Sequence, residues 1–212
     1  MIGVMGGTFD PVHFGHLRPA TEIAEWLELD CLHWIPVNVP PHRARPMTPA
    51  FHRLAMVECA LAGASSGARM VADRRELDRA GPSYTVDTLA SLRREIGPDA
   101  PLVLMMGMDA FTGFRSWHRW PDILDQTHLV VAHRPGSPAA EELDDELAER
   151  FVQSPNALRT SRGGLIALKQ VTQLDISSTR IRSLLRQGRN PRYLLPDAVL
   201  DYIHDHRLFS AS

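Results

Sequence analysis

Two kinds of apolar pattern alternate along the chain from its first residues. Short runs of consecutive apolar residues occur at 2–6, 32–37, 69–73, 102–107, 128–132 and 164–171. Runs of this length without polar alternation predict strands that are buried on both faces. Between the runs, apolar residues recur at helical spacing, as at Leu17, Ala20, Ile23, Ala24 and Leu27. Buried strands that alternate with helices predict an α/β protein with a doubly wound parallel sheet.

The pattern changes in the last third of the chain. It predicts an acidic helix over 139–152, a polar loop over 154–164, and two closing helices over about 177–187 and 196–206. We expect a single domain over residues 1–212, in which residues 172–212 form a small C-terminal helical extension of that same domain.

Composition narrows the class of protein. The 212 residues carry a formal net charge of −2, and no stretch approaches the roughly 20 apolar residues that cross a bilayer. The first residues lack the basic segment of a signal peptide, and Cys31 and Cys59 are too few for a disulfide framework. We therefore expect buried free thiols in a cytoplasmic protein with no nucleic-acid or membrane partner, either a monomer or a homo-oligomer. Lys169 is the only lysine, so a phosphate site would rest on arginine, histidine and backbone N–H groups.

The segment GGTFDPVHFGHL, residues 6–17, joins the first predicted strand to the first helix. In open α/β sheets, ligands bind at the carboxyl ends of the strands. Gly6 and Gly7 allow a ligand to approach the backbone closely and tolerate positive φ. His13 and His16 stand at the start of the helix, where free N–H groups and the positive end of the dipole favour phosphate. The segment therefore predicts a site for a polyphosphate.

Two other interpretations of this segment are open. It is a glycine-rich turn with two incidental histidines, or it is a metal site made by Asp10, His13 and His16. The metal interpretation lacks a further obvious ligand in the sequence.

The segment ISSTRIR, residues 176–182, is the second candidate motif. Ser177 or Ser178 is a natural N-cap, so the first turn would hold Ser178, Thr179 and Arg182. Hydroxyls, N–H groups and a guanidinium in one turn are suited to phosphate oxygens. The alternative is an ordinary capped surface helix.

These two motifs carry a family resemblance. An H-x-G-H loop followed by a late S-S/T-x-R helix start resembles the nucleotidylyltransferase superfamily. Along nearly its whole length the chain is similar to bacterial nicotinate-nucleotide adenylyltransferases. The further segments that carry this resemblance are VPPHR (39–43), GPSYTVDTL (81–89), GMDAF (107–111), SWHRW (116–120), HRPG (133–136) and LLPDAVLDYI (194–203).

The resemblance implies a Rossmann-like nucleotidylyltransferase fold and adenylyl transfer from ATP to nicotinate mononucleotide. The products would be nicotinate adenine dinucleotide and pyrophosphate, in NAD biosynthesis. It implies Mg²⁺ held mainly by the ATP phosphates, with no metal ligand from the protein. His13, His16 and Arg182 would be catalytic, through positioning and charge stabilisation. The ATP-binding residues that it implies are Gly6, Gly7, Thr8, Phe9, His13, His16, Ser177, Ser178, Thr179 and Arg182.

The mononucleotide would bind to the middle of the chain. The candidates are Tyr84, Thr85, Asp109, Trp117, His42, Arg43 and Arg134. Asp109 is placed to accept hydrogen bonds from ribose hydroxyls or is simply a helix N-cap. Trp117 stacks on the pyridine ring or belongs to the core. Two unpaired N–H donors near Tyr84 and Thr85, at a helix start near Ser83, would favour the carboxylate of nicotinate over the amide of nicotinamide.

Three rival functions are open. The first is a sibling transferase of the same superfamily. Its acceptor would be phosphopantetheine or another phosphorylated compound, against which the PSYT and SWHRW segments argue, or nicotinamide mononucleotide. The second is a nucleotide sensor without turnover, which loss of His13, His16 or Arg182 would favour; all three are present. The third is a metallohydrolase, which predicts activity without ATP.

Overall fold

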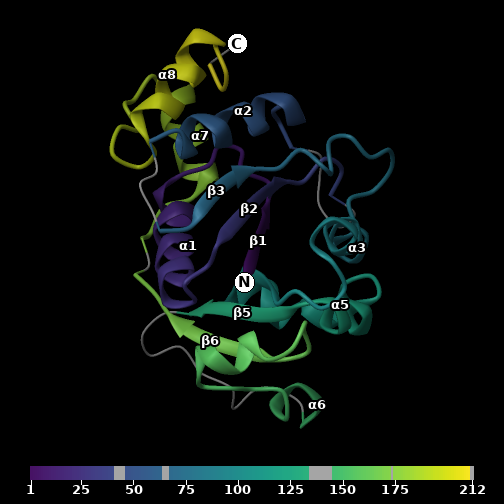
Figure 1. The fold of residues 1–212 in the computed structure, drawn as a ribbon. Helices are drawn as coiled ribbons and strands as arrows, with labels where there is room; N and C mark the ends of the chain where they lie inside the picture. The colour runs from purple at the N-terminus through teal and green to yellow at the C-terminus, as the bar shows by residue number, and fades with distance from the viewer. Residues whose placement is uncertain (41–45, 64–66, 134–144, 173, 211–212) are drawn as a thin grey trace.

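A six-stranded parallel sheet forms the centre of the computed structural model, which describes residues 1–40, 46–63, 67–133, 145–172 and 174–210 (Figure 1). Each predicted strand is present, so the doubly wound α/β class is confirmed. The strands are β1 (Ile2–Gly7), β2 (Cys31–Pro36), β3 (Arg69–Ala72), β4 (Leu102–Gly107), β5 (His128–His133) and β6 (Ile166–Gln170).

The strand order is β3-β2-β1-β4-β5-β6, the order of the dinucleotide-binding doubly wound fold. β1 pairs with β2 on one side, where Ile2 faces Cys31, and with β4 on the other, where Ile2 faces Leu102. The chain direction across the sheet reverses between β1 and β4. Ligands in such sheets bind in the crevice beyond the carboxyl ends of the strands at this reversal, so a site is expected where Gly7 and Gly107 end their strands.

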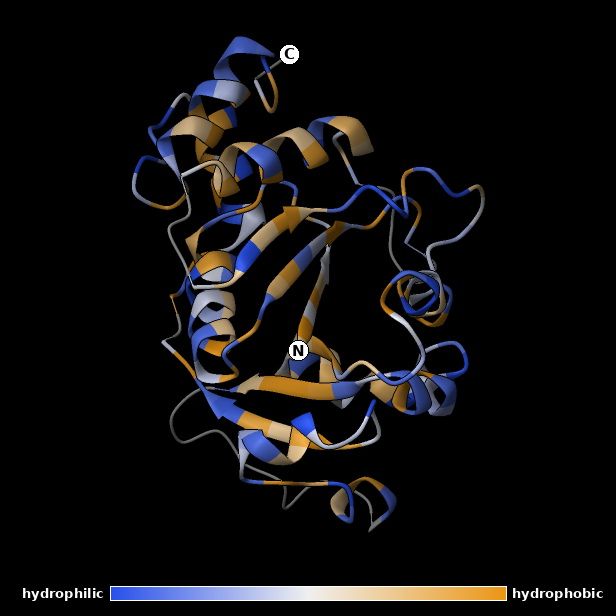
Figure 2. Cartoon of the chain, viewed as in Figure 1, coloured by the Kyte–Doolittle hydropathy of each residue, from blue (hydrophilic) through white to orange (hydrophobic). Residues whose placement is uncertain are grey.

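Alternating side chains of the strands feed two apolar cores, one on each face of the sheet. Val103 and Met105 of β4 belong to the first core, whereas Leu102 and Leu104 belong to the second. β5 is apolar along most of its length because helices cover both of its faces (Figure 2). β3, at the edge, is less buried than the predicted run of apolar residues suggested.

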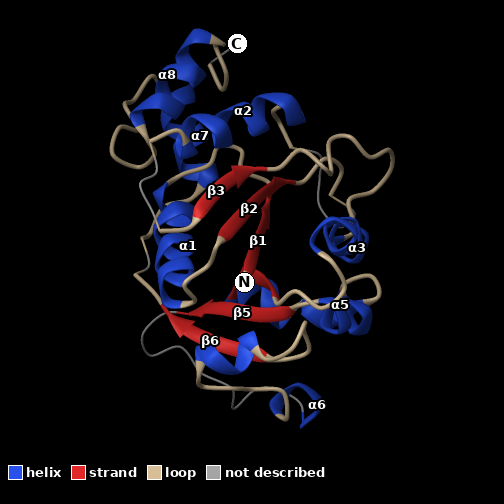
Figure 3. Cartoon of the chain, viewed as in Figure 1, coloured by secondary structure: helices blue, strands red, loops and turns tan. Residues whose placement is uncertain are grey.

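Helices on the two faces differ in the part of the chain from which they come (Figure 3). The first core takes residues from α1 (Phe14–Trp26), α2 (Ala50–Leu61), α7 (Ser178–Arg186) and α8 (Asp197–Asp205). The second core takes residues from α3 (Thr85–Ile96), α4 (Met108–Thr112), the 3₁₀ turn η1 (Phe114–Ser116), α5 (Trp120–Gln126) and α6 (Asp145–Ala148). In Figure 1, α1 lies to the left of the sheet, and α3 and α5 lie to the right.

The C-terminal helices pack on the body of the sheet domain. Ile181 of α7 and Val199 of α8 join the same apolar core as Ile23 of α1, and α8 contacts α2. We propose on this ground that residues 172–212 belong to one domain with the rest of the chain.

Three sequence-based expectations need correction or qualification. The polar loop over 154–164 contains a 3₁₀ helix, η2 (Pro155–Arg159), which Ser154 caps by accepting a hydrogen bond from the Asn156 N–H. Of the acidic helix expected over 139–152, residues 139–144 lie outside the described residues, and the described helix is α6. Cys31 is buried, but Cys59 is only half-buried.

None of the helices in the described residues is long and apolar enough to cross a membrane.

Candidate active site

The loop between β1 and α1 lies at the reversal point of the sheet. A Cβ on Gly6 would meet nothing within 4 Å, so the backbone there is open to a ligand. A Cβ on Gly7 would lie 2.7 Å from the ring of Phe9, so this glycine makes room for Phe9 rather than for a ligand. The positive φ of the loop also falls on Phe9, at 49°, and not on either glycine. The Phe9 ring is buried between Trp34 and His16 and anchors the loop.

His13 and His16 form a stacked pair at the start of α1. Their ring centroids lie 3.8 Å apart, and His13 occupies the N-cap position. The His13 N–H donates to Nδ1 of His16 across 3.3 Å. Because Nδ1 of His16 is an acceptor, the proton of its neutral ring resides on Nε2. His16 therefore offers an N–H donor at Nε2.

Both histidines are neutral at physiological pH. Burial lowers the pKa of His13 to about 4. Burial, followed by the charge of His13, lowers the pKa of His16 to about 3. A polyphosphate supplies negative charge that favours the protonated form, so ligand binding would raise both values.

The ISSTRIR segment packs directly against this loop. The Ser178 hydroxyl donates to the carbonyl oxygen of Pro11 at 2.9 Å, and Nη1 of Arg182 donates to that of Asp10 at 2.7 Å. A Cβ on Gly15 would lie 3.2 Å from the carbonyl oxygen of Ile176 and 3.0 Å from the His13 ring. The two motifs, more than 150 residues apart in the sequence, therefore form one surface.

The N-terminus of α7 has the predicted cap. Ser177 is the N-cap, and its hydroxyl oxygen accepts from the Arg180 N–H at 3.2 Å. The Thr179 hydroxyl accepts from Nη2 of Arg182 at 3.2 Å. This contact turns the guanidinium of Arg182 along the first turn of the helix, where Ser178 already contacts the loop.

Buried polar atoms without a hydrogen-bond partner gather here. Among the described residues they include Oδ1 of Asp10, Nδ1 of His13 and Nε of Arg182, all from the two motifs. A buried polar atom without a partner is costly and calls for water, an ion or a ligand. The concentration of such atoms in the two motifs makes this surface the candidate binding site.

The alternative of a metal site at Asp10, His13 and His16 finds no support in the part of the chain that the structure describes. No group of three or more histidine, cysteine or acidic side chains is placed to hold a metal there. Oδ2 of Asp10 instead accepts from the Met47 N–H at 3.1 Å, and Nδ1 of His16 is occupied by a backbone donor.

The second half of the candidate site begins at the N-terminus of α3. This helix starts at Thr85 with Tyr84 as its N-cap, two residues later than the predicted start near Ser83. The Tyr84 N–H donates to the carbonyl oxygen of Pro82 at 3.2 Å, so it is not the free donor that we expected. Within the described residues, the Thr85 N–H donates to no backbone acceptor. One of the two expected donors is thus available.

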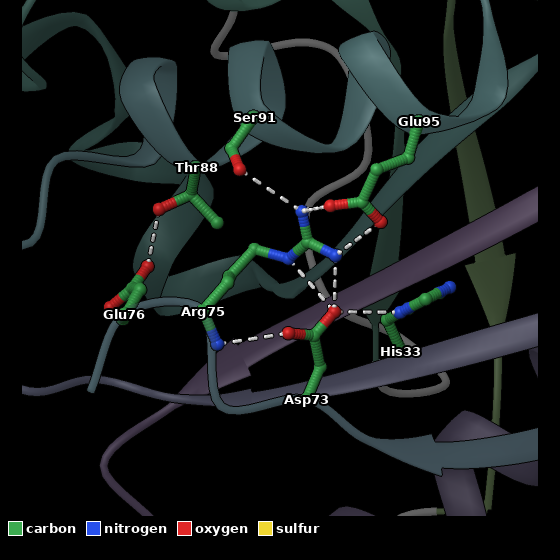
Figure 4. A network of polar contacts seen from close by, with 7 residues as sticks. All are labelled: His33, Asp73, Arg75, Glu76, Thr88, Ser91 and Glu95. Carbon is green, nitrogen blue, oxygen red and sulfur yellow. Dashed lines mark hydrogen bonds and ion pairs between the residues drawn. The ribbon is translucent and has the colours of Figure 1, made fainter. Parts of the chain in front are cut away.

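A polar network holds α3 in place (Figure 4). Arg75 donates to Asp73, which follows β3, and to Glu95 of α3, and Nδ1 of His33 lies 2.8 Å from Oδ2 of Asp73. Although burial opposes ionisation, hydrogen bonds from His33 and Arg75 lower the pKa of Asp73 to about 2. The network therefore ties α3 to β2 and to the segment after β3.

A second part of this network reaches the first turn of α3. The Thr88 hydroxyl donates to Oε1 of the buried Glu76 at 2.7 Å. Ser83 accepts from the N–H groups of Asn38 and Val39 at 3.2 and 3.3 Å and so joins the loop after β2 to the start of α3. Burial raises the pKa of Glu76, against the opposing effect of the Thr88 hydroxyl. The start of α3 is fixed from both sides.

The other mononucleotide candidates are partly placed. Asp109 is exposed in the first turn of α4, and the N-cap of that helix is Gly107, so the N-cap alternative for Asp109 is wrong. Trp117 is half-buried with its ring 5.7 Å from that of Phe114. His118, which our sequence analysis did not single out, lies with its ring 4.3 Å from that of Tyr84 and links the SWHRW run to α3. His42, Arg43 and Arg134 lie outside the described residues.

Sequence reasoning also missed Arg53 of α2. Its side chain is 1% exposed and donates to the carbonyl oxygen of Thr8 in the β1–α1 loop. A signal was present, because Arg53 shares its helical spacing with the buried Met56 and Val57.

Comparisons with known proteins agree with this arrangement. The sequence matches the family described as cytidylyltransferase-like over residues 4–184. A probable nicotinate-nucleotide adenylyltransferase of Methylococcus capsulatus is 50% identical over 99% of this chain and 100% of its own length. A relative of the same name from Pseudomonas aeruginosa PAO1 is also 50% identical, over 99% of this chain and 97% of its own length.

A solved structure shows the same fold. It is that of Plasmodium falciparum nicotinic acid mononucleotide adenylyltransferase complexed with NaAD, which matches with a TM-score of 0.73 at 17% identity. The match covers 98% of this chain and 96% of that chain.

Proposed function

Because the chain belongs to the cytidylyltransferase-like family and, within it, to the nicotinate-nucleotide adenylyltransferases, we propose that it transfers the adenylyl group of ATP to nicotinate mononucleotide. The observation that carries the proposal is the single surface made by the H-x-G-H loop and the start of α7, with its buried, unpartnered polar atoms. The role in NAD biosynthesis and a cytoplasmic location belong to the same proposal.

The reaction needs no nucleophile from the protein. An oxygen of the mononucleotide 5′-phosphate forms a bond to the α-phosphorus of ATP, and the bond from that phosphorus to the bridging oxygen of the β-phosphate breaks. Pyrophosphate leaves with the electron pair of this bond. The protein therefore acts by orienting the two substrates in line and by stabilising charge on the transferring and leaving groups.

The residues of the first motif would bind the triphosphate. Nε2–H of the neutral His16 is a donor, and the open backbone at Gly6 lets phosphate oxygens approach. The Thr8–Phe9 segment would supply further backbone groups. Arg182, Ser178 and Thr179 would hold the leaving phosphates from the other side. Mg²⁺ would arrive with ATP and, held mainly by the phosphates, would offset their charge.

The start of α3 would bind the pyridine ring. The Thr85 N–H is a free donor for the nicotinate carboxylate, and Trp117 offers an aromatic face. Asp109 would accept hydrogen bonds from the ribose. His42, Arg43 and Arg134 stay predictions for the mononucleotide phosphate.

Pyrophosphate release from Mg-ATP, with nicotinate mononucleotide and nicotinamide mononucleotide as separate acceptors, tests this function. A buried donor facing an amide NH₂ costs about 1–3 kcal/mol. One such donor predicts a preference for the acid of roughly 10- to 100-fold in kcat/KM. The Trp117→Ala variant should raise KM for both acceptors and leave their ratio nearly unchanged, since stacking does not distinguish the two rings.

Other outcomes point to the rival functions. Comparable kcat/KM values for the two acceptors would contradict recognition of the nicotinate carboxylate by the start of α3. Turnover only with a different phosphorylated acceptor would indicate a sibling transferase. ATP binding without pyrophosphate release would indicate a nucleotide sensor.

A further inference from the structure

Arg53 is a completely buried cation at the back of the β1–α1 loop. It lies on α2, and its side chain is 1% exposed. Nε donates to the carbonyl oxygen of Thr48 at 3.1 Å, and Nη1 donates to that of Thr8 at 2.8 Å. An arginine buried to this degree is rare and costly, and here its bonds go to backbone carbonyls. The free energy that this burial costs suggests that the guanidinium has a role in the site.

The bond to Thr8 fixes the orientation of one peptide group. The carbonyl of Thr8 and the N–H of Phe9 belong to the same planar trans peptide and point in opposite directions. When Arg53 holds the carbonyl toward the interior, the Phe9 N–H is directed away from Arg53. Within the described residues this N–H donates to no backbone acceptor. Phe9 is 1% exposed, so this N–H is a further buried donor without a backbone partner at the candidate site, like the unpartnered side-chain atoms of the two motifs.

The positive charge of Arg53 is favoured by two nearby carboxylates. Burial lowers the pKa of the Arg53 guanidinium, and the negative charges of Asp10 and Glu76 oppose this effect. Since the ordinary pKa of arginine is far above neutrality, the group stays a cation. Asp10 belongs to the first motif, and Glu76 supports the start of α3 through Thr88. Each of the two carboxylates keeps one buried oxygen without a hydrogen-bond partner, and the nearby cation of Arg53 offsets part of their charge.

We propose that Arg53 is a positioning residue that holds the Thr8–Phe9 peptide with its N–H directed at the triphosphate. The proposal rests on the proposed function, because it takes ATP as the ligand of this loop. It assigns to Arg53 no contact with the substrate. The residue acts through the backbone that it holds.

The test compares Arg53→Met and Arg53→Lys with Arg93→Met as the matched control. Arg93 also donates to backbone carbonyls, those of Gln126 and Ala100, but belongs to α3 and lies outside both motifs. Misdirecting one charge-stabilising donor predicts a fall of about 10- to 100-fold in kcat/KM for ATP in Arg53→Met. KM for the mononucleotide should change little, and Arg53→Lys should recover part of the loss. Arg93→Met should lose thermal stability but keep the wild-type kcat/KM for ATP and the wild-type KM for the mononucleotide.

Chemical rescue separates positioning from folding. Arg53→Ala leaves a cavity shaped for a guanidinium, so millimolar guanidinium ion should restore part of kcat/KM for ATP and should not do so in Arg93→Ala. Equal kinetics for Arg53→Met and the wild type would overturn the proposal, as would an equal loss on both substrates. If Arg53→Met does not fold, the same comparison of the loss on ATP with the loss on the mononucleotide is made with Arg53→Lys.

A wrong assignment of the acceptor can be distinguished from a wrong role for Arg53. Equilibrium binding of Mg-ATP alone, without an acceptor, reports on the loop whatever the acceptor proves to be. Wild-type protein that binds Mg-ATP while Arg53→Met binds it weakly supports the inference even if nicotinate mononucleotide is not the acceptor.

Discussion

The hydroxyl of Ser178 donates a hydrogen bond to the carbonyl oxygen of Pro11 across 2.9 Å, and these residues are 167 positions apart in the sequence. A second hydrogen bond to the same loop runs from Arg182 to the carbonyl oxygen of Asp10. Together they turn two successive carbonyls of the β1–α1 loop toward α7. The start of α7 thus supports the loop in addition to any contact that it makes with phosphates.

The fit between Gly15 and its neighbours predicts a sensitive position. In Gly15→Ala, the new Cβ would meet the His13 ring at 3.0 Å and the Ile176 carbonyl oxygen at 3.2 Å. We expect a loss of about 1–3 kcal/mol in the free energy of unfolding, as for other overpacked sites. Separation of the two motifs should also lower kcat. Gly67→Ala, where the added Cβ meets nothing within 4 Å, is the control. Urea unfolding and steady-state kinetics would measure both effects, and identical behaviour of the two variants would contradict the tight fit.

Loss of the His16 ring should slow the chemical step. His16→Ala removes the Nε2 donor, and by comparison with loss of one charge-stabilising donor kcat should fall by roughly 10²–10³-fold. The fold should survive, because the ring contributes no backbone hydrogen bond except the one from the His13 N–H. Far-ultraviolet circular dichroism checks the fold beside the kinetics. A folded variant with nearly full kcat would remove His16 from the catalytic residues.

The two buried histidines predict a pH-dependent stability. The pKa of His13 is about 4 and that of His16 about 3 in the folded chain, against about 6.5 for an ordinary histidine. Between pH 6.5 and 4 the unfolded chain binds more protons than the folded chain, so stability falls as the pH falls. In the middle of this window each histidine contributes a slope that approaches about 1.4 kcal/mol per pH unit. At pH values well above 6.5 both states are neutral and the contribution is flat.

The variant His16→Gln measures the contribution of one histidine to the pH dependence of the free energy of unfolding. Its unfolding free energy should fall less steeply between pH 6.5 and 4 than that of the wild type. Equal slopes for wild type and His16→Gln would show that burial does not hold this ring neutral.

Arg182 and Ser178 should affect one substrate more than the other. Arg182→Ala should weaken the use of ATP, and of pyrophosphate in the reverse reaction, more than it weakens mononucleotide binding. Ser178→Ala should show a smaller effect in the same direction, because it loses a single neutral hydrogen bond worth about 1 kcal/mol. Arg189→Ala, on the exposed segment after α7, serves as the control. A loss confined to the mononucleotide would reassign α7 to the other substrate.

The sequence carried the parts of the fold and the site that depend on local pattern. Runs such as LVLMMG are apolar enough to mark β4 over its full length, 102–107. The cap of α7 was narrowed to Ser177 or Ser178 because a capping hydroxyl and the following turn are neighbours in the chain, and Ser177 is the cap. The order of the strands could not be read in this way, because pairing of β1 with β4 joins segments about a hundred residues apart through contacts that no local pattern encodes.

The misses have the same origin. The helical spacing of Arg53 placed it beside the apolar face of α2, but its bond to the β1–α1 loop depends on packing that this spacing does not encode. Gly6 and Gly7 were expected to tolerate positive φ, whereas the loop has its positive φ at Phe9, a bulky residue with a buried ring. The Tyr84 N–H was expected to be free, but a bond to Pro82 depends on turn geometry that the letters PSYT do not specify.

The division of the apolar interior into two cores has an evolutionary consequence. Phe9, Val12 and Ile181 anchor the two motifs that we propose for ATP in the first core, whereas Tyr84 and Trp117 rest on the second, across the sheet. Substitutions that repack the second core can reshape the acceptor pocket while the apparatus for ATP keeps its supports. A fold built in this way can inherit one nucleotide chemistry and diversify its acceptor.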